Sequence, residues 1–183
     1  EMKYTFAKEG TITWYPRFTY MGFQYAQILS CPGEVKAENF TACVMHSEME
    51  PTGNITCSNP LLNQLHHNYL WGLKGNFLDV PTDCPQRDER LGWTGDAQIF
   101  CRTACYLMNT YTFYRKWLHD VEVDQTPEGG VPHVVPNIEE GKTDGNWLLS
   151  QGPHSAAAWA DVAVIAPWTL YLMYGDTKIL EIQ

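Results

Sequence analysis

The sequence predicts a mainly α-helical protein in which a few β-strands precede an array of amphipathic helices. Three observations carry this prediction. Apolar residues recur at helical spacing after residue 58, short β-branched and aromatic runs lie before residue 50, and strands do not alternate with helices. Without a strand-helix alternation, a helical array or a helical toroid is favoured over a parallel α/β fold. With 44% hydrophobic and 18% charged residues, the chain has enough apolar material for a packed core.

The expected strands all lie near the start of the chain. Residues 11–15 and 23–28 are β-branched or aromatic and partly alternating, and a further extended stretch is expected over 40–49. Three or four strands without a partner sheet are too few for an independent sandwich, so they are interpreted as the end of a β-domain. We therefore expect residues 1–50 to form the C-terminal part of that β-domain with a linker, and residues 51–183 to belong to a helical domain.

Capping residues mark the first expected helices. Asn59 followed by Pro60 is typical of a helix start, and Gly75 is typical of its end, with Leu62, Leu65, His66, Tyr69 and Leu73 as the apolar stripe between them. A second helix is expected over 96–109. Its stripe continues to residue 121 after a break at Asn109-Thr110.

The remaining helices follow a long loop. Residues 124–153 are rich in Gly and Pro and predict that loop. A helix is expected to begin at Ser155, to be kinked by Pro167 and to end at Gly175. Asp176-Thr177 would then cap the next helix.

Charge and composition exclude several classes of function. The formal net charge of -9, with Arg115-Lys116 as the longest basic run, argues against a nucleic-acid partner, and no apolar run is long enough to span a membrane. No signal peptide is recognised, and a periplasmic or extracellular location is favoured over a cytoplasmic one. The 7 Trp and 10 Tyr residues suit stacking on sugar rings, although aromatic residues more often fill cores.

The six cysteines are expected to be free thiols, because a chain of this length and apolarity needs no disulfide framework. Cys101 and Cys105, with His119 further on, have the spacing of part of a metal site. No second closely spaced pair completes a tetrahedron, so they are interpreted as buried apolar residues of one helix face. We expect no metal and no cofactor.

The densest group of polar residues is the run Asp83–Asp96, DCPQRDERLGWTGD. It could be a solvated loop whose charges pair with one another. However, apolar runs on both sides, Phe77–Val80 and Ala97–Phe100, make a surface excursion less natural. Hydrolysis of a glycosidic bond needs one carboxylic acid and a second carboxylate, and crowded carboxylates can keep one of their number protonated. The run therefore has the components of a glycosidase site.

The same fourteen residues closely resemble the signature of bacterial α-L-rhamnosidases, glycoside hydrolase family 78. Two flanking stretches agree with this resemblance. Residues 18–25 resemble the last strands of the β-sandwich that precedes the catalytic domain, and Trp159-Ala160-Asp161 before Pro167-Trp168 resembles a later helix of the catalytic barrel. The resemblance covers most of the chain and implies an incomplete (α/α)6 barrel preceded by strands from the end of a β-sandwich domain.

The resemblance also implies roles for individual residues. Glu89 matches the general acid, kept neutral by its crowded neighbours. Asp83, Arg87, Trp93 and Asp96 match sugar-binding groups. Trp147, Trp159 and Asp161 are weaker candidates for substrate contact, since a Trp on an apolar helix face, as expected at 159, is more often a core residue. His133 and His154 lie in loops and are expected to be exposed and idle.

Enzymes of this family invert, so a base must face the acid at about 6.5 to 9.5 Å with room for water. In the family that base is a Glu on a later barrel helix, and this sequence ends before any matching position. We therefore expect these residues alone to show little or no hydrolysis of terminal α-L-rhamnosides. Alternatives are another inverting (α/α)6 glycosidase and a non-catalytic carbohydrate-binding fragment. Self-association through an unfinished barrel surface is also expected.

Overall fold

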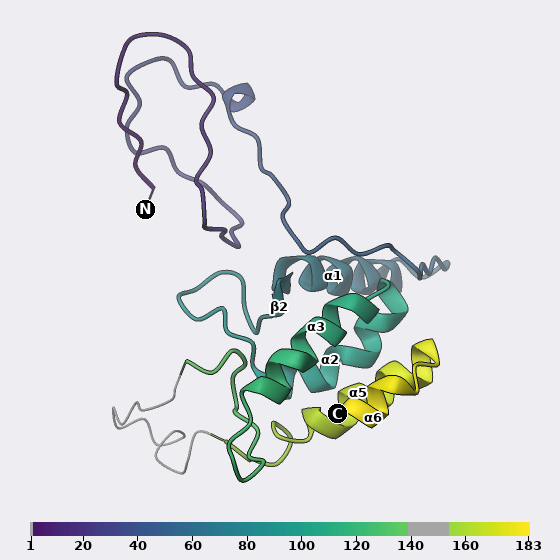
Figure 1. Ribbon diagram of the computed structural model, residues 1–183. Coiled ribbons are helices and arrows are strands. Elements are labelled where there is room, and N and C mark those ends of the chain that lie inside the picture. The colour runs from purple at the N-terminus through teal and green to yellow at the C-terminus, as the bar shows by residue number, and fades with distance from the viewer. Residues whose placement is uncertain (1, 139–153) are drawn as a thin grey trace.

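The computed structural model describes residues 2–138 and 154–183, and this part of the chain is mainly helical (Figure 1). Its elements, in order, are η1 (Ala37–Asn39), α1 (Pro60–Asn76), β1 (Phe77–Leu78), β2 (Val80–Pro81), α2 (Thr94–Leu107), α3 (Tyr111–Val123), α5 (Val162–Tyr174) and α6 (Lys178–Ile182). No helix among the described residues is long and apolar enough to cross a membrane. The mainly α fold class is confirmed.

Most of residues 2–45 extend away from the helices as a long loop (Figure 1). The end of this stretch packs on the helical part, where Met49 is buried in the core and the N–H of Asn109 donates to the carbonyl of Glu50 at 2.7 Å. The strands expected over 11–15, 23–28 and 40–49 are not formed as paired strands, and in this stretch the short helix η1 is the one regular element described. A strand needs a neighbour for its N–H and C=O groups and a partner for its apolar face. Here Tyr15, Phe23 and Tyr25 are exposed, so these extended segments bury little apolar surface.

Helix α1 begins where the sequence predicts. The Asn59 side chain accepts a hydrogen bond from the backbone N–H of Leu61 at 2.9 Å, and Pro60 occupies the first turn. The helix runs one residue past Gly75. Within it only Leu73 is buried, whereas Leu62 and Leu65 of the expected apolar stripe are exposed.

A short hairpin, with strands of two residues each, links α1 to the loop that follows. β1 and β2 pair antiparallel, with Phe77 opposite Pro81, and Asp79 between them has a left-handed φ of 66°. The ring of Phe77 is buried and stacks on Phe113 of α3, with centroids 4.6 Å apart. This anchor places the start of the following loop against the helices.

The expected break between the second and third helices is confirmed, since α2 ends at Leu107 and α3 begins at Tyr111. α2 begins at Thr94, two residues before the expected start. Its first turn is fixed by buried Thr94, whose hydroxyl donates to the carbonyl of His133 at 3.0 Å. The loop after α3 therefore packs over the start of α2.

The helix expected from Ser155 begins later. Ser155 and Ala158 have left-handed φ angles of 64° and 70°, which a right-handed helix cannot include, so residues 155–161 form turns and α5 starts at Val162. Gly175 ends α5 at φ 72°, as predicted. The side chain of Asp176 accepts from the N–H of Lys178 at 3.0 Å and caps α6.

The core lies where α5 crosses α2 and α3 (Figure 1). Trp117 of α3 is fully buried, and its indole N–H donates to the carbonyl of Val135 at 3.1 Å, which ties the loop after α3 to the core. Fully buried side chains from four helices complete it: Leu73, Cys101, Ala104, Tyr114, Leu118, Val121, Val162, Ala166 and Leu170.

Candidate active site

The polar run forms an irregular loop between β2 and α2, here called the signature loop (residues 82–93). Its two ends are closed on each other by Asp83 and Leu91. The N–H of Asp83 donates to the carbonyl of Leu91 at 3.0 Å, and the Asp83 carboxylate accepts from the N–H of Leu91 at 2.9 Å. The Asp83 side chain is 8% exposed, so this carboxylate forms a buried closure of the loop.

Arg87 joins the two carboxylates inside the loop. Its Nε and Nη2 atoms both lie 2.7 Å from Oε2 of Glu89, and Nη2 lies 3.6 Å from Oδ2 of Asp83. The hydrogen bond and charge of Glu89 raise the pKa of Arg87, which therefore stays a cation. The Arg87 side chain is 62% exposed and so remains in contact with solvent.

Glu89 has a donor at each oxygen. Oε1 accepts from the indole N–H of Trp93 at 3.0 Å, while Oε2 accepts from Arg87. Two donors suit the ionised carboxylate. The side chains bonded to Glu89 in this arrangement are therefore the two donors Arg87 and Trp93.

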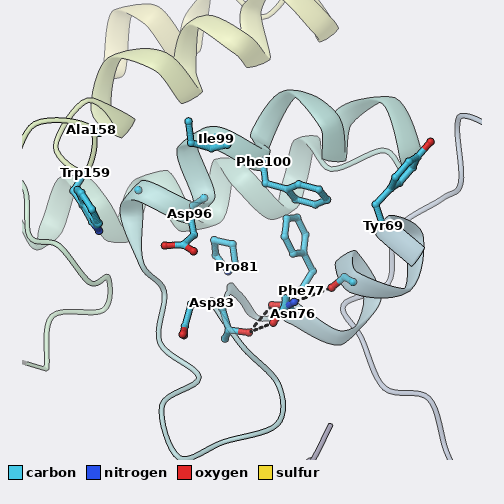
Figure 2. A pocket seen from close by; sticks show the side chains of 14 residues that line it. Tyr69, Asn76, Phe77, Pro81, Asp83, Asp96, Ile99, Phe100, Ala158 and Trp159 are labelled. Carbon is cyan, nitrogen blue, oxygen red and sulfur yellow. Dashed lines mark hydrogen bonds between the residues drawn. The ribbon is translucent and has the colours of Figure 1, made fainter. Parts of the chain in front are cut away.

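Beside this loop lies a cavity of about 510 Å³, within the size range of small-ligand sites. Figure 2 shows Asp83, Asp96 and Trp159 at this cavity, contributed by the signature loop, by α2 and by the turns before α5. Its other walls come mainly from α1, β2 and α2: Tyr69, Gly72, Asn76, Phe77, Pro81, Thr82, Gly95, Ala97, Ile99, Phe100 and Ala158. Glu89, Arg87 and Trp93 lie next to the cavity rather than in its lining.

Asp96 stands in the first turn of α2 and faces the cavity (Figure 2). Removal of its carboxyl group from water raises the pKa of Asp96, and the charges of Asp83 and Glu89 add to that rise. A hydrogen bond to its own backbone acts in the opposite direction. Asp96 is therefore a carboxyl group that holds a proton more tightly than usual.

Trp159 forms one wall of the cavity and lies on the first turn of α2. A Cβ atom at Gly95 would lie 2.9 Å from Cε2 of Trp159, so the indole covers the glycine closely. The alternative of a core residue on a helix face does not describe Trp159, because it lies in the turns before α5 and is partly exposed.

His133 was expected to be exposed, and this expectation is wrong. The residue is 3% exposed and its ring lies 6.4 Å from that of Trp159. Burial, followed by the charge of His154, lowers the pKa of His133, so it is neutral near pH 7. The Gly and Pro residues around His133 predict a loop, but they do not indicate whether that loop packs on other elements. The burial of His133 could therefore not be predicted from them.

The structure does not bring Asp161 to the cavity. Its carboxylate accepts from the N–H of Ala158 at 3.0 Å and holds the turn before α5. Trp147 lies outside the described residues. Among the cavity residues that sequence reasoning missed, Phe77 had the clearest signal, as part of the apolar run preceding the signature loop; Tyr69 and Asn76 had none that pointed to a site.

Ligand atoms of Asp83, Cys84 and Glu89 lie within 4.8 Å of one another, a grouping that could hold a metal ion. The guanidinium of Arg87 already pairs with both of these carboxylates. A cation would have to displace it against like-charge repulsion, so the arrangement favours an ion-pair network. All six cysteines are free thiols, as expected, and Cys84, Cys101 and Cys105 are buried.

Comparison with known proteins places the chain among glycosidases. Residues 50–183 match the model of the bacterial alpha-L-rhamnosidase 6 hairpin glycosidase domain, and residues 1–46 match that of the bacterial alpha-L-rhamnosidase concanavalin-like domain. Alpha-L-rhamnosidases from Formosa agariphila and Streptomyces avermitilis are each 43% identical to the chain, over 180 and 177 residues. Each alignment covers 97% of the chain, but the chain spans only 18% and 16% of the length of these relatives.

Solved structures give the same result. The Streptomyces avermitilis alpha-L-rhamnosidase complexed with L-rhamnose matches 82% of the chain with a TM-score of 0.73 and 42% identity, and the chain covers 14% of it. The alpha-L-rhamnosidase from Dictyoglumus thermophilum matches 82% of the chain with a TM-score of 0.71 and 37% identity, and the chain covers 16% of it.

Proposed function

Because this chain belongs to the bacterial alpha-L-rhamnosidase family, we propose that the protein hydrolyses glycosides that end in α-L-rhamnose, with inversion at the anomeric carbon and with Glu89 as the proton donor. The observation that carries the proposal is the juxtaposition of Glu89, through the Arg87 bridge, with Asp83 at the edge of the cavity. The carboxylic acid and the sugar-sized space needed for glycoside cleavage are thus adjacent.

In this proposal the sugar occupies the cavity. Trp159 offers a flat apolar face to the C–H groups of the pyranose ring, and Asp83 and Asp96 offer carboxyl oxygens to its hydroxyl groups. The raised pKa of Asp96 suits a group that both donates to and accepts from a hydroxyl. Deoxysugars present both an apolar and a polar face, which matches this combination of walls.

Proton donation requires Glu89 to lose part of its pairing with Arg87. Arg87 is well placed to move, because it is 62% exposed and its second carboxylate contact, with Asp83, is long at 3.6 Å. An arriving sugar hydroxyl gives the guanidinium a new acceptor, and water leaves the space around Glu89 at the same time. Both changes favour the protonated carboxyl group when a leaving oxygen lies beside it. Trp93 keeps that group in place.

Asp83 is unsuited to be the second carboxylate of the reaction. Its oxygen lies within 4.8 Å of that of Glu89, closer than the about 6.5 to 9.5 Å that an inverting pair needs for its water. It is also buried and holds the N–H of Leu91. We assign it to binding the sugar and closing the loop.

We also propose a division of the chain near residue 50, with residues 1–50 from a β-sandwich domain and its linker and residues 51–183 from the catalytic barrel. The two matched family models meet between residues 46 and 50, which supports this boundary.

A panel of para-nitrophenyl glycosides tests the proposed function on the whole protein. We expect α-L-rhamnoside to be cleaved with a kcat/KM at least about 100-fold above the other sugars, since lost hydroxyl contacts are costly in a polar site. NMR of the first product should show the anomer opposite to the substrate. Preference for another sugar would favour a different inverting (α/α)6 glycosidase, and rhamnose binding without turnover would favour a carbohydrate-binding protein.

A further inference from the structure

A short piece of the N-terminal segment holds the signature loop from outside. The N–H of Gly22 donates to the carbonyl of Pro85 at 2.7 Å, and Nη1 of Arg90 donates to the carbonyl of Tyr20 at 2.5 Å. In the described part of the chain, these are the hydrogen bonds that join residues 84–90 to any segment outside the signature loop. Figure 1 shows the turn of the N-terminal segment that approaches this loop.

The contact is close as well as hydrogen-bonded. A Cβ atom at Gly22 would lie 2.9 Å from Cγ of Pro85, so only a glycine fits without displacing the loop. The guanidinium of Arg90 lies 5.4 Å from the centroid of the Tyr20 ring, in cation–π geometry. Arg90 itself has a left-handed φ of 51°, a backbone conformation that residues other than glycine seldom adopt.

The two anchors stand on either side of Glu89 in the sequence. Pro85 precedes it by four residues and Arg90 follows it directly. Of the two side-chain partners of Glu89, Arg87 lies within residues 84–90, whereas Trp93 is held at the start of α2 by its bridge with Val134. The position of the carboxyl group relative to the helices therefore depends on the Asp83–Leu91 closure, on the bond from Trp93, and on the contacts with Tyr20 and Gly22 that hold residues 85 and 90. A shift of about 1 Å in a reacting group can cost 100-fold in rate.

We infer that Arg90 is a positioning residue for Glu89, and that residues 20–22 of the N-terminal segment aim the proton donor although they do not line the cavity. This inference rests on the proposed function, because the contact of residues 20–22 with the signature loop can position a proton donor only if Glu89 is that donor. In this inference the backbone of residues 20–22 supports the loop that carries the acid and touches no substrate.

The test separates proton donation from all other steps. kcat/KM is measured on the whole protein with a dinitrophenyl α-L-rhamnoside, whose leaving group needs little protonation, and with a rhamnosyl disaccharide, whose leaving group needs it fully. The ratio of the two values does not depend on the fraction of enzyme that is folded. Arg90→Gln removes the bond to the Tyr20 carbonyl, and Gly22→Ala pushes Pro85 away from the N-terminal segment. Each variant should lower the ratio of the disaccharide value to the aryl value about 10-fold or more.

Two control variants sharpen the outcome. Tyr20→Phe keeps both the carbonyl acceptor and the aromatic ring. Arg102→Gln removes an exposed arginine of α2 that belongs neither to the signature loop nor to the lining of the cavity. Both should leave the ratio within about twofold of the wild-type value.

Glu89→Gln is measured in parallel so that the two claims can fail separately. If Glu89→Gln lowers the ratio but Arg90→Gln and Gly22→Ala lower both rates equally, Arg90 and residues 20–22 are merely structural and the inference is overturned. If Glu89→Gln itself leaves the ratio unchanged, the proposed acid is wrong and the inference falls with it.

Discussion

The indole Nε1 of Trp93 lies 3.0 Å from Oε1 of Glu89, across four residues of the signature loop. This hydrogen bond links the last residue of the loop, which precedes α2, to the proposed proton donor. Because Trp93 also pairs with Val134 in an isolated β-bridge, the backbone that carries the indole is fixed to the packed loop after α3. This bond therefore orients Glu89 relative to the start of α2 and the loop after α3.

Trp93→Phe should remove this bond and keep most of the ring. We expect kcat for a rhamnosyl disaccharide to fall about 10-fold, since a hydrogen bond to a charged group contributes roughly 1.5 to 3 kcal/mol. KM should change less, because the aromatic surface remains. Steady-state kinetics on the whole protein would measure both constants. A rise in KM alone would mean that Trp93 only binds sugar.

Gly95→Ala should disturb the cavity wall. The added methyl group would lie 2.9 Å from the Trp159 ring, and overpacking of this kind costs about 1 to 3 kcal/mol of unfolding free energy. The displaced indole should also raise KM for the rhamnoside. Urea unfolding and steady-state kinetics would measure the two effects.

Gly72→Ala is the matched control for that substitution. A Cβ at Gly72, within α1, meets nothing within 4 Å, so this variant should gain about 0.5 to 1 kcal/mol from helix propensity. Equal changes in the free energy of unfolding for Gly95→Ala and Gly72→Ala would contradict the close contact between Gly95 and Trp159.

Asp96→Asn should change how stability depends on pH. The folded-state pKa of Asp96 is raised, so between the ordinary value of about 3.9 and the raised value the folded protein binds more protons than the unfolded chain. Wild-type stability from this group is therefore lost as pH rises through that window. Relative to wild type, the variant should be more stable at about pH 7 than at about pH 3.5. Urea midpoints at both pH values would show it, and a constant difference would contradict it.

The helices that could be predicted from the sequence are those with local signals. Asn59-Pro60 and Gly175 act through capping and backbone freedom within a few residues, so their effects can be read without the fold. The predicted helix start at Ser155 was wrong, because Ser155 and Ala158 have left-handed φ angles. Such angles depend on tertiary contacts, which the spacing of apolar residues does not reveal. The paired strands expected before residue 50 failed because pairing needs partner strands.

The candidate site was predictable in composition but not in geometry. The signature loop pointed to Asp83, Arg87 and Glu89 together, and the structure joins them through one guanidinium. That Glu89 has a donor at each oxygen, and that Asp96 has the raised pKa, depend on folded distances and burial. The burial of His133 could not be read from a Gly- and Pro-rich loop for the same reason.

The central claim, that Glu89 donates the proton, is tested most directly by Glu89→Gln in the whole protein, compared with Asp96→Asn. We expect Glu89→Gln to lower kcat/KM for a rhamnosyl disaccharide by about 100-fold to 10,000-fold, and to lower it far less for a dinitrophenyl α-L-rhamnoside, because general acid catalysis matters only where the leaving group needs a proton. Asp96→Asn should lower both to a similar extent. Equal losses on both substrates in Glu89→Gln, or a loss confined to the disaccharide in Asp96→Asn instead, would contradict the assignment.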